Sequence, residues 1–360
     1  MKIEKMIPTC KDYLWGGNKL KEKYGKQTDF TPCAESWELS YHKDGLTRLS
    51  DGRTLAQAFS ADELGENVKE FEFFPMLIKF IDACDNLSIQ VHPSDEYALE
   101  NENSFGKTEM WYVVEADEGA GLYVGFKNAV SQEEYEAAIK ENRLTDLLNF
   151  YEVKSGETYF IPSGTVHAIG KGCLICEIQQ NSNLTYRVYD YGRVDKNGKP
   201  RELHIDKALK VSDLTAYSPK NLNASTEEGE LLGISKYFTV SRLSVEGPRV
   251  LKCDKGSFRC VTCVAGEGSL GEKQIRLGDS YFISASDESV DLDGKMILIV
   301  SSVRRYRVET DTANAKIVDD LGNIVASAKT IENESRKALV KRLLSKSGIA
   351  LFDVDDKTIE

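Results

Sequence analysis

The chain has 360 residues, enough for two modest domains with hydrophobic cores, and its formal net charge is −12 at pH 7. Because the acidic residues are scattered and no basic face is evident, the composition argues against nucleic acid or an anionic membrane as partner. Residues 1–13 hold no apolar signal-peptide core, and the longest apolar run, 296–300, is too short to span a bilayer. The sequence therefore predicts a cytoplasmic protein whose eight cysteines are reduced thiols.

Segments of strand-like composition dominate, each bounded by Gly, Pro, Asn or Asp. They lie at 36–41, 76–82, 87–92, 110–116, 122–126, 158–161 and 174–179. One helix is predicted at 131–150, where Ser131 and Glu134 form a capping box ahead of an apolar stripe. We expect a fold dominated by β-structure, with a few covering helices.

Polar and apolar side chains alternate along 87–92. A strand there places Ser88, Gln90 and His92 on one face and Leu87, Ile89 and Val91 on the other. The polar face points into a cavity if the apolar face packs in the core. In the next segment, Lys107 and Glu109 share a face if that segment is also extended.

A second pattern completes a candidate metal site. Gly156, Pro162, Gly164 and His167 have the spacing G-x5-P-x-G-x2-H, which matches the second motif of cupin barrels. In that motif the Gly and Pro close a tight turn and the His returns inward. The first cupin motif normally begins His-x-His and supplies a Glu soon after.

In this chain Gln90 replaces the first His of that motif, and Glu109 follows a longer insertion. We predict that Gln90, His92, Glu109 and His167 bind one metal ion. Taken singly, each histidine is equally compatible with a structural role, and Gln90 with that of a polar barrel residue. The combination of residues favours the metal.

An internal repeat predicts a second barrel of the same type. Gly-Glu-Thr-Tyr-Phe-Ile at 156–161 recurs as Gly-Asp-Ser-Tyr-Phe-Ile at 278–283. The second copy has Ser284 in place of Pro162 and Ser289 in place of His167, and no His follows His204. We therefore expect two cupin-like jelly-roll barrels, of which only the first binds a His-ligated metal.

The expected domains are an N-terminal metal-binding barrel at 1–211 with the helical insert, a linker at 212–232, a metal-free barrel at 233–308 and a C-terminal extension at 309–360. The extension is expected to be a small α/β appendage, with a hairpin at 315–325 turning on Gly-Asn and a basic amphipathic helix near 335–344. This hairpin resembles the opening of sugar kinases of the actin-like superfamily. Their Gly-Gly-Thr phosphate loop is missing, so we assign no kinase activity.

Two C-x-x-C pairs, 173/176 and 260/263, invite a zinc-ribbon interpretation. Both lie in β-rich runs without a turn between the cysteines. Residues three apart in a strand face opposite sides and cannot share a metal, so we reject a cysteine-based site.

The segment Leu-Ser-Ile-Gln-Val-His-Pro at 87–93, Lys-Thr-Glu at 107–109 and the distant His167 together resemble the type I mannose-6-phosphate isomerases, in their short bacterial form, of the cupin superfamily. The resemblance covers roughly residues 8 to 305. It implies a zinc-dependent aldose–ketose isomerase that interconverts D-mannose 6-phosphate and D-fructose 6-phosphate through an enediol intermediate.

The resemblance also implies one Zn²⁺ per chain, with Mn²⁺, Fe²⁺ or Co²⁺ as substitutes, and a small-molecule sugar phosphate as partner. Two alternatives stay open. One is a sugar-phosphate-binding cupin without catalysis, and the other is a cupin metalloenzyme of different chemistry, such as oxygenation.

Lysines at both 79 and 107 match family lysines linked to substrate binding and proton transfer. We expect Lys107 to carry the proton and Lys79 to bind substrate, helped by Ser88 at the phosphate. Lys79 lies in an apolar strand, where an idle buried lysine is costly, although it could instead reach the barrel rim.

Arg187 corresponds to the active-site arginine of the family. Its fork of donors suits a phosphate or a developing enediolate. The alternative is a salt bridge to Asp190 or Glu177. Asn183 stands where many relatives have Asp, and Asn cannot act as a base at neutral pH.

Overall fold

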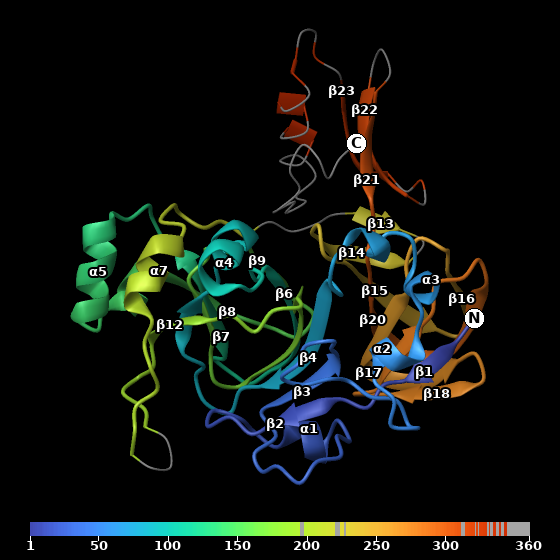
Figure 1. Cartoon of the computed structure of the whole chain (residues 1–360), viewed down its shortest axis with the longest axis horizontal. Helices are drawn as coiled ribbons and strands as arrows, with labels where there is room; N and C mark the ends of the chain where they lie inside the picture. The colour runs from blue at the N-terminus through green and yellow to red at the C-terminus, as the bar shows by residue number, and fades with distance from the viewer. Residues whose placement is uncertain are drawn as a thin grey trace. The chain divides into compact units, whose positions relative to one another are not determined.

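The computed structural model describes residues 1–194, 198–219, 224–226, 228–310, 314–320, 322, 324–329 and seven positions between 331 and 343. Strands dominate these residues and the helices are few and short, which confirms the predicted fold class (Figure 1). The chain divides into two compact units. The first unit comprises Thr9–Trp37 and Leu77–Pro219; the second comprises Met1–Pro8, Glu38–Met76 and Lys220–Glu360.

Two antiparallel sheets build the first unit. The six-stranded sheet has the order β2 (Thr9–Lys11), β3 (Glu35–Leu39), β4 (Met76–Asp82), β11 (Cys173–Gln180), β6 (Glu109–Ala116), β9 (Thr158–Ile161). The five-stranded sheet has the order β12 (Tyr186–Tyr189), β5 (Ile89–Val91), β10 (His167–Ile169), β7 (Gly121–Phe126), β8 (Leu148–Glu152).

The main core of this unit lies between the two sheets. Buried side chains from both sheets meet there, among them Ile81, Trp111, Leu122 and Ile175. A second core covers the outer face of the five-stranded sheet, where Ile89 and Val91 pack with residues of α5 and α7. In Figure 1 these two helices lie side by side next to β12. The helices of this unit are α1 (Lys19–Glu22), α4 (Asp95–Glu102), α5 (Gln132–Lys140), α6 (Leu144–Leu147) and α7 (Ile205–Val211).

The single helix predicted at 131–150 is wrong in length. Ser131 does cap a helix, since its side chain accepts a hydrogen bond from Glu134 N at 3.2 Å, but α5 ends at Lys140. Asn142 then adopts a left-handed conformation with φ of 56°, which stops the helix. From Leu148 the chain forms β8, because pairing with β7 overrides the helical pattern. The apolar stripe is nevertheless buried as predicted.

The second unit contains one large antiparallel sheet. Its main path is β1 (Ile3–Lys5), β19 (Ser280–Ile283), β17 (Arg259–Leu270), β20 (Ser289–Ser302), β15 (Thr239–Glu246), β14 (Gly229–Ile234), β13 (Ala224–Thr226), with β16 (Arg249–Lys252) paired to β20 and β18 (Lys273–Arg276) to β17. Its short helices are α2 (Leu55–Ala58), α3 (Ala61–Leu64) and the 3₁₀ helix η1 (Val68–Glu70).

The compact units differ from the contiguous domains that the sequence predicted. Met1–Pro8 belongs to the second unit, because β1 pairs with β19 in the register Ile3↔Ile283. Residues 38–76 also belong there, although they were assigned to the first barrel. The expected linker at 212–232 contains β13 and the start of β14.

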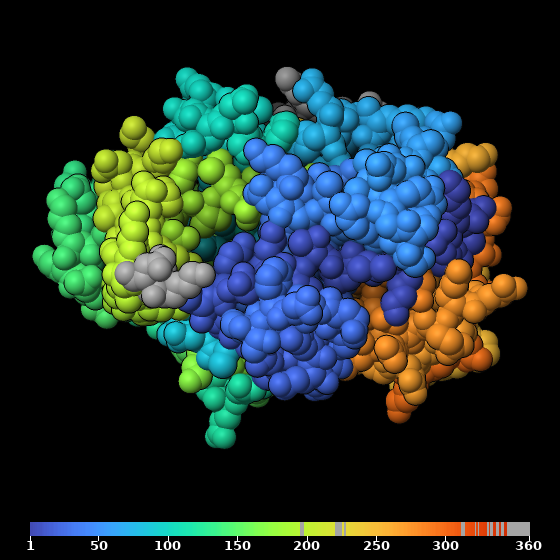
Figure 2. Space-filling view, turned by 60° about the horizontal axis from the view of Figure 1, so that its bottom comes forward, coloured from blue at the N-terminus to red at the C-terminus, as the bar shows by residue number. Residues whose placement is uncertain are grey.

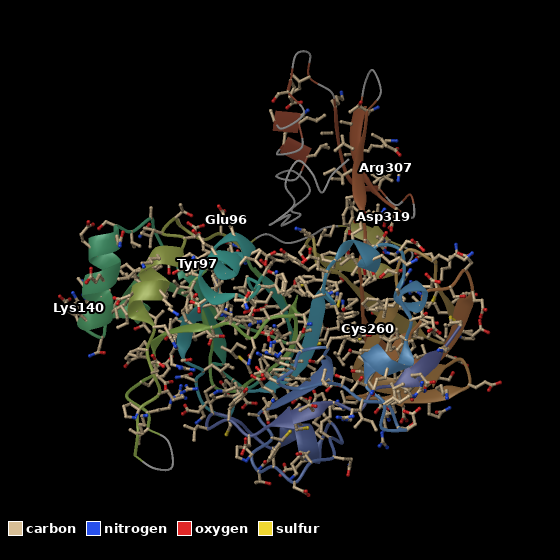
Figure 3. All side chains as sticks on the ribbon, viewed as in Figure 1. Glu96, Tyr97, Lys140, Cys260, Arg307 and Asp319 are labelled. Carbon is tan, nitrogen blue, oxygen red and sulfur yellow. The ribbon has the colours of Figure 1, made fainter. Side chains whose placement is uncertain are left out.

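The C-terminal extension forms a separate three-stranded sheet of β21 (Tyr306–Thr310), β22 (Asn314–Asp319) and β23 (Ile324–Lys329). Adjacent strands β22 and β23 confirm the predicted hairpin. Figure 3 labels Arg307 and Asp319 on neighbouring strands, and the Arg307 guanidinium donates to the Asp319 carbonyl at 3.2 Å. This sheet shares a core with Leu231, Ile234, Leu339 and Leu343 of the same unit. Much of the predicted helix near 335–344 lies outside the described residues.

Candidate active site

Three segments of the first unit bring one cluster of potential ligands together. His92 follows β5, Glu109 begins β6 and His167 begins β10. Their ligand atoms all lie within 4.8 Å of one another, and all three residues are buried. The two imidazole rings are 4.8 Å apart between centroids. This is the only such cluster among the residues that the structure describes.

The backbone conformation explains why glycine occupies two positions of the predicted cupin motif. Gly156 and Gly164 have φ angles of 94° and 86°, a region that side-chain-bearing residues avoid. The amide of Gly164 also donates to the carbonyl of His92 at 2.8 Å. The turn that precedes His167 is therefore tied to the segment that carries His92.

The hydrogen bonds of the two Nδ1 atoms determine which imidazole nitrogen can bind a metal. His92 Nδ1 lies 2.9 Å from the carbonyl of Leu184, and His167 Nδ1 lies 2.8 Å from that of Thr165. A carbonyl can only accept, so each Nδ1 carries the proton and each Nε2 presents a lone pair. Both Nε2 atoms face Glu109, at 3.5 Å from His92 and 3.3 Å from His167.

The two Nε2 lone pairs and the Glu109 carboxylate face one another and can converge on a cation. Glu109 Oε1 is buried and accepts no hydrogen bond from the described residues. The donor set of two imidazole nitrogens and a carboxylate oxygen suits a divalent ion such as zinc. The three side chains thus fit a metal ion.

Gln90 lies at the edge of the same cluster. Its Nε2 is 3.3 Å from His167 Nε2 and donates to that lone pair. Rotating the terminal amide by half a turn would place Oε1 at the same position, where it could serve as a fourth ligand. Gln90 pairs directly with His167 across β5 and β10, which fixes this proximity.

Lys107 provides positive charge at the cluster. Its ammonium donates to Glu109 Oε2 and lies 3.1 Å from His92 Nε2. Burial favours a neutral carboxyl, but Lys107 outweighs it and holds the pKa of Glu109 well below its usual range. Burial, together with Lys107, lowers the pKa of His92 to about 3. These two lowered pKa values keep Glu109 ionised and His92 neutral, which are the forms that bind a metal.

A chain of alternating charges continues from Lys107 into the six-stranded sheet. Glu177 lies 3.7 Å from the Lys107 ammonium and 3.2 Å from that of Lys79, which in turn lies 3.8 Å from Glu35. Burial alone would lower the pKa of Lys79, but Glu35 and Glu177 raise it, so this lysine is cationic. Lys79 is 5% exposed and does not reach solvent at the barrel rim.

Sequence reasoning missed Glu177 as a member of the site. Burial and the nearby Glu109 charge raise the pKa of its carboxyl, and its Oε1 accepts a hydrogen bond from Trp111 Nε1 at 3.0 Å. The signal was present in the sequence: Glu177 interrupts an apolar strand in the same way as Lys79 does.

A cavity of about 260 Å³ opens beside the cluster. The predicted residues Lys79, Ser88, Gln90, Lys107 and Arg187 all line it. Further lining residues that the sequence did not single out as functional are Tyr13, Glu35, Thr185 and Arg201. In Figure 2 the dark blue N-terminal segment and the yellow-green segment near residues 185–215 lie next to each other; both contribute to this wall.

Leu87 also lines the cavity, although the alternating pattern placed it on the opposite face. Strand β5 begins only at Ile89, so Leu87 precedes the regular alternation. The rest of the pattern holds, because Ser88 and Gln90 face the cavity while Ile89 and Val91 are in the core.

Cations outnumber anions on the cavity wall. Lys79, Lys107, Arg187 and Arg201 face two carboxylates, Glu35 and Glu177. This local excess contrasts with the net charge of −12 of the chain. An anionic ligand is therefore favoured at this position.

Arg187 does not form either of the salt bridges considered from the sequence. Asp190 pairs with Arg193 and Arg201, and Glu177 pairs with Lys79 and Lys107. The Arg187 guanidinium instead donates to the Glu202 carbonyl at 2.8 Å. Burial first and the nearby Arg201 second lower the pKa of Arg187.

Two further expectations concern the cysteines and the membrane. All eight cysteines are free thiols, and none joins a cluster of potential metal ligands. No helix among the described residues has the length and apolar character needed to cross a membrane.

Comparison with known proteins identifies the family. A model of the phosphomannose isomerase type I catalytic domain matches residues 3–119, and one of the mannose-6-phosphate isomerase cupin domain matches residues 228–303. The chain is 37% identical over 303 residues to a mannose-6-phosphate isomerase of Streptococcus mutans, covering 80% of this chain and 94% of the relative. It is 36% identical over 309 residues to mannose-6-phosphate isomerase ManA of Bacillus subtilis, covering 82% and 96%.

Comparison with solved structures points to the same family. The crystal structure of a mannose 6-phosphate isomerase from Bacillus subtilis has a TM-score of 0.76 and 32% identity, covering 84% of this chain and 99% of the other. A putative mannosephosphate isomerase from Archaeoglobus fulgidus has a TM-score of 0.66 and 26% identity, covering 83% and 97%. Together with the curated relatives, these matches show that the chain belongs to the type I mannose-6-phosphate isomerase family.

Proposed function

We propose that this protein is a divalent-metal-dependent aldose–ketose isomerase that interconverts D-mannose 6-phosphate and D-fructose 6-phosphate, with zinc as the metal. The observation that carries the proposal is the buried His92, Glu109 and His167 cluster beside a cavity whose wall is rich in cations. Similarity to curated mannose-6-phosphate isomerases supports the choice of substrate.

The proposed ligands are His92, Glu109, His167 and, after its amide turns, Gln90. Two neutral imidazoles, a neutral amide and one carboxylate leave a zinc centre with a charge of about +1. The bound metal would supply Lewis-acid stabilisation for the negative charge that builds on the sugar oxygens during isomerisation. Mn²⁺, Fe²⁺ and Co²⁺ could be held by the same donors.

The isomerisation moves one proton from C2 of the open-chain aldose to C1 and another from the O2 hydroxyl to O1, through an enediol. We assign the C2-to-C1 transfer to Lys107, which lines the cavity and lies between Glu109 and Glu177. The raised pKa of Glu177 makes its carboxylate a suitable group to exchange a proton with the Lys107 ammonium, 3.7 Å away. Lys79 and Ser88 bind substrate, and Arg187 stabilises the phosphate or the enediolate.

A coupled assay that follows fructose 6-phosphate tests the proposal. Purified protein is expected to convert mannose 6-phosphate, to lose turnover after treatment with a chelator and to regain it with Zn²⁺. An oxygenase would instead consume oxygen and require iron. A binding protein without catalysis would be stabilised thermally by the sugar phosphate but show no turnover with any divalent metal.

A further inference from the structure

A buried tryptophan contacts the proposed reaction site from outside the cavity. Trp111 lies on β6, directly opposite Glu177 on β11, and its indole Nε1 donates to Glu177 Oε1 at 3.0 Å. Glu177 lines the cavity, whereas Trp111 is 1% exposed and does not line it. The indole therefore acts on a side chain of the proposed site without touching the substrate.

The two oxygens of Glu177 face different lysines. Oε1, which accepts from the indole, lies 3.7 Å from the ammonium of Lys107. Oε2 lies 3.2 Å from the ammonium of Lys79. The torsion that rotates a glutamate carboxylate has broad minima, so the aliphatic part of the side chain does not by itself fix which oxygen faces which lysine.

The hydrogen bond from the indole restricts this rotation. A buried Trp N–H normally has an acceptor, and here the acceptor is Oε1 of Glu177. Turning Oε1 away from Trp111 would leave the N–H unsatisfied in the core, which is destabilising. The favoured orientations of the carboxylate are therefore those that keep Oε1 near Lys107.

The indole is held in place by packing on its other sides. Its ring meets the imidazole of His167 edge to face, with the centroids 5.3 Å apart and an angle of 77° between the planes. Trp111 also belongs to the core between the two sheets, together with Leu122 and Ile175. The direction of the N–H is thus set by the core and not by Glu177 alone.

We propose that Trp111 is a positioning residue for the isomerisation, which holds the Glu177 carboxylate so that Oε1 faces Lys107 and Oε2 faces Lys79. The inference rests on the proposed function for the proton exchange between Glu177 and Lys107. One oxygen is then directed at the lysine that carries the proton, and the other pairs with the lysine that binds substrate. The orientation itself can be tested without turnover.

Trp111→Phe removes the N–H but keeps an aromatic ring beside His167. The kcat of the metal-loaded protein is expected to fall by ~10- to 100-fold, the usual effect of losing a hydrogen bond to a charged group. KM should stay within about 3-fold of wild type, because Trp111 does not line the cavity. The zinc content, measured by metal analysis, should not change.

Trp37→Phe is the matched control. The Trp37 indole donates to Glu35 Oε2 at 2.7 Å, so this variant also removes an N–H donor from a buried carboxylate beside Lys79. Glu35 has no part in the proposed proton transfer, so kcat should change by less than about 3-fold. An equal loss of kcat in both variants would overturn the proposal, because the effect would not be specific to Glu177.

A double-mutant cycle with Glu177→Gln distinguishes positioning from a structural role. If Trp111 acts through Glu177, adding Trp111→Phe to Glu177→Gln should lower kcat by less than about 3-fold further. A structural role would lower kcat by the same factor in both backgrounds, and that result would overturn the proposal. An unchanged kcat in Trp111→Phe alone would also overturn it.

The indole N–H provides a readout even if Trp111→Phe does not fold or if the protein does not isomerise mannose 6-phosphate. The chain has three tryptophans, so protein labelled at the indole nitrogens gives three N–H resonances in NMR spectra. Trp15→Phe and Trp37→Phe assign the Trp111 resonance by elimination. Glu177→Gln replaces a charged acceptor with a neutral one and should move the Trp111 proton resonance upfield, whereas an unmoved resonance would overturn the proposal.

The outcomes separate the positioning role from the proposed function. A wild-type protein without turnover, in which the Trp111 resonance depends on Glu177, rejects the proposed function and keeps the orientation of the carboxylate. Turnover in the wild type with an unchanged kcat in Trp111→Phe rejects the positioning role alone.

Discussion

Glu109 is the residue on which the candidate metal site depends most. It faces both Nε2 atoms, accepts from Lys107 and has one oxygen without a hydrogen bond among the described residues. These contacts follow from its position at the start of β6, opposite Gln179 on one side and Ile161 on the other. A carboxylate in this position is either metal-bound or strongly dependent on Lys107.

Substituting Glu109→Gln should abolish stoichiometric metal binding and lower kcat/KM by at least ~100-fold, since changes to outer contacts of metal sites alone reach that size. Metal analysis and the coupled assay measure both effects. Glu115→Gln is the control, because Glu115 lies on the same strand but pairs with Lys23 and Tyr24. Full turnover in Glu109→Gln would show that the ligand set is wrong.

Lys107→Met should lower kcat by ~10²- to 10⁴-fold, the range expected for loss of a proton-transfer group, while metal is retained. Steady-state kinetics with metal-loaded protein measures the effect. If KM rises and kcat stays the same, Lys107 binds substrate and Glu177 becomes the leading base.

Strand pairing shows which residues of the two barrels are equivalent and how they differ. In the first barrel Glu109 pairs with Ile161, and in the second Arg259 pairs with Ile283. Because 156–161 and 278–283 are the repeated segments, Arg259 occupies the position equivalent to Glu109. The second barrel thus carries a positive charge where the first carries a carboxylate.

Arg259 belongs to a buried ionic network. Its side chain bonds to Glu228 at 2.6 Å and to Asp254 at 2.5 Å, and Arg304 bonds to the same carboxylates at 2.9 and 2.8 Å. Neither guanidinium is more than 1% exposed. Removing one member of such a network is strongly destabilising, because the remaining charges stay buried without a partner.

Arg259→Met should therefore lower the free energy of unfolding by about 3 kcal/mol or more. Urea unfolding of the metal-loaded protein measures the loss. Arg242→Met is a matched control in the same unit, because the Arg242–Glu230 pair is partly exposed and should contribute less than about 1 kcal/mol. Equal effects of the two substitutions would contradict a stabilising network.

The network also predicts a dependence of stability on pH. Burial alone would raise the pKa of Asp254, but Arg304 and Arg259 outweigh it and lower the pKa below 3.8. A lowered pKa means that the folded state favours the carboxylate. Its stabilisation is thus complete well above pH 3.8 and is lost as the pH falls through the lowered pKa. The difference in unfolding free energy between wild type and Asp254→Asn should be constant near neutral pH and shrink below pH 3.8. A difference that grows on acidification would refute this assignment.

Short-range patterns predicted the elements of the site well. The alternation at 87–92, the turn before His167 and the extended Lys107–Glu109 segment each depend on a few neighbouring residues, and the structure brings them together. The helix at 131–150 was overestimated because its last residues pair with β7, a contact that no local pattern encodes. Glu177 was missed because its role depends on Lys79 and Lys107, which come from other strands.

Long-range pairing also determines the organisation of the whole molecule. The compact units differ from the contiguous domains expected from the sequence, because β1, at the start of the chain, pairs with β19 of the second unit. The repeat predicted a second barrel of the same type, but not the buried arginine network at the position equivalent to Glu109.

The C-terminal sheet begins at Tyr306, just beyond residue 303, where the match to the cupin-domain model ends. Removing residues 306–360 should leave kcat within about 2-fold of wild type, because the proposed catalytic residues lie in the first unit. The melting temperature should fall, because Leu231 and Ile234 lose their apolar cover. A large drop in kcat with unchanged stability would instead assign the extension a role in catalysis.

The guanidinium at position 259 has one further consequence. A side chain cannot dissociate, so the second barrel carries this cation permanently, whereas the metal proposed for the first barrel would have to come from solution. Removing the metal proposed for the first barrel would leave the Arg259 network of the second barrel as it is, because none of its members is a proposed metal ligand.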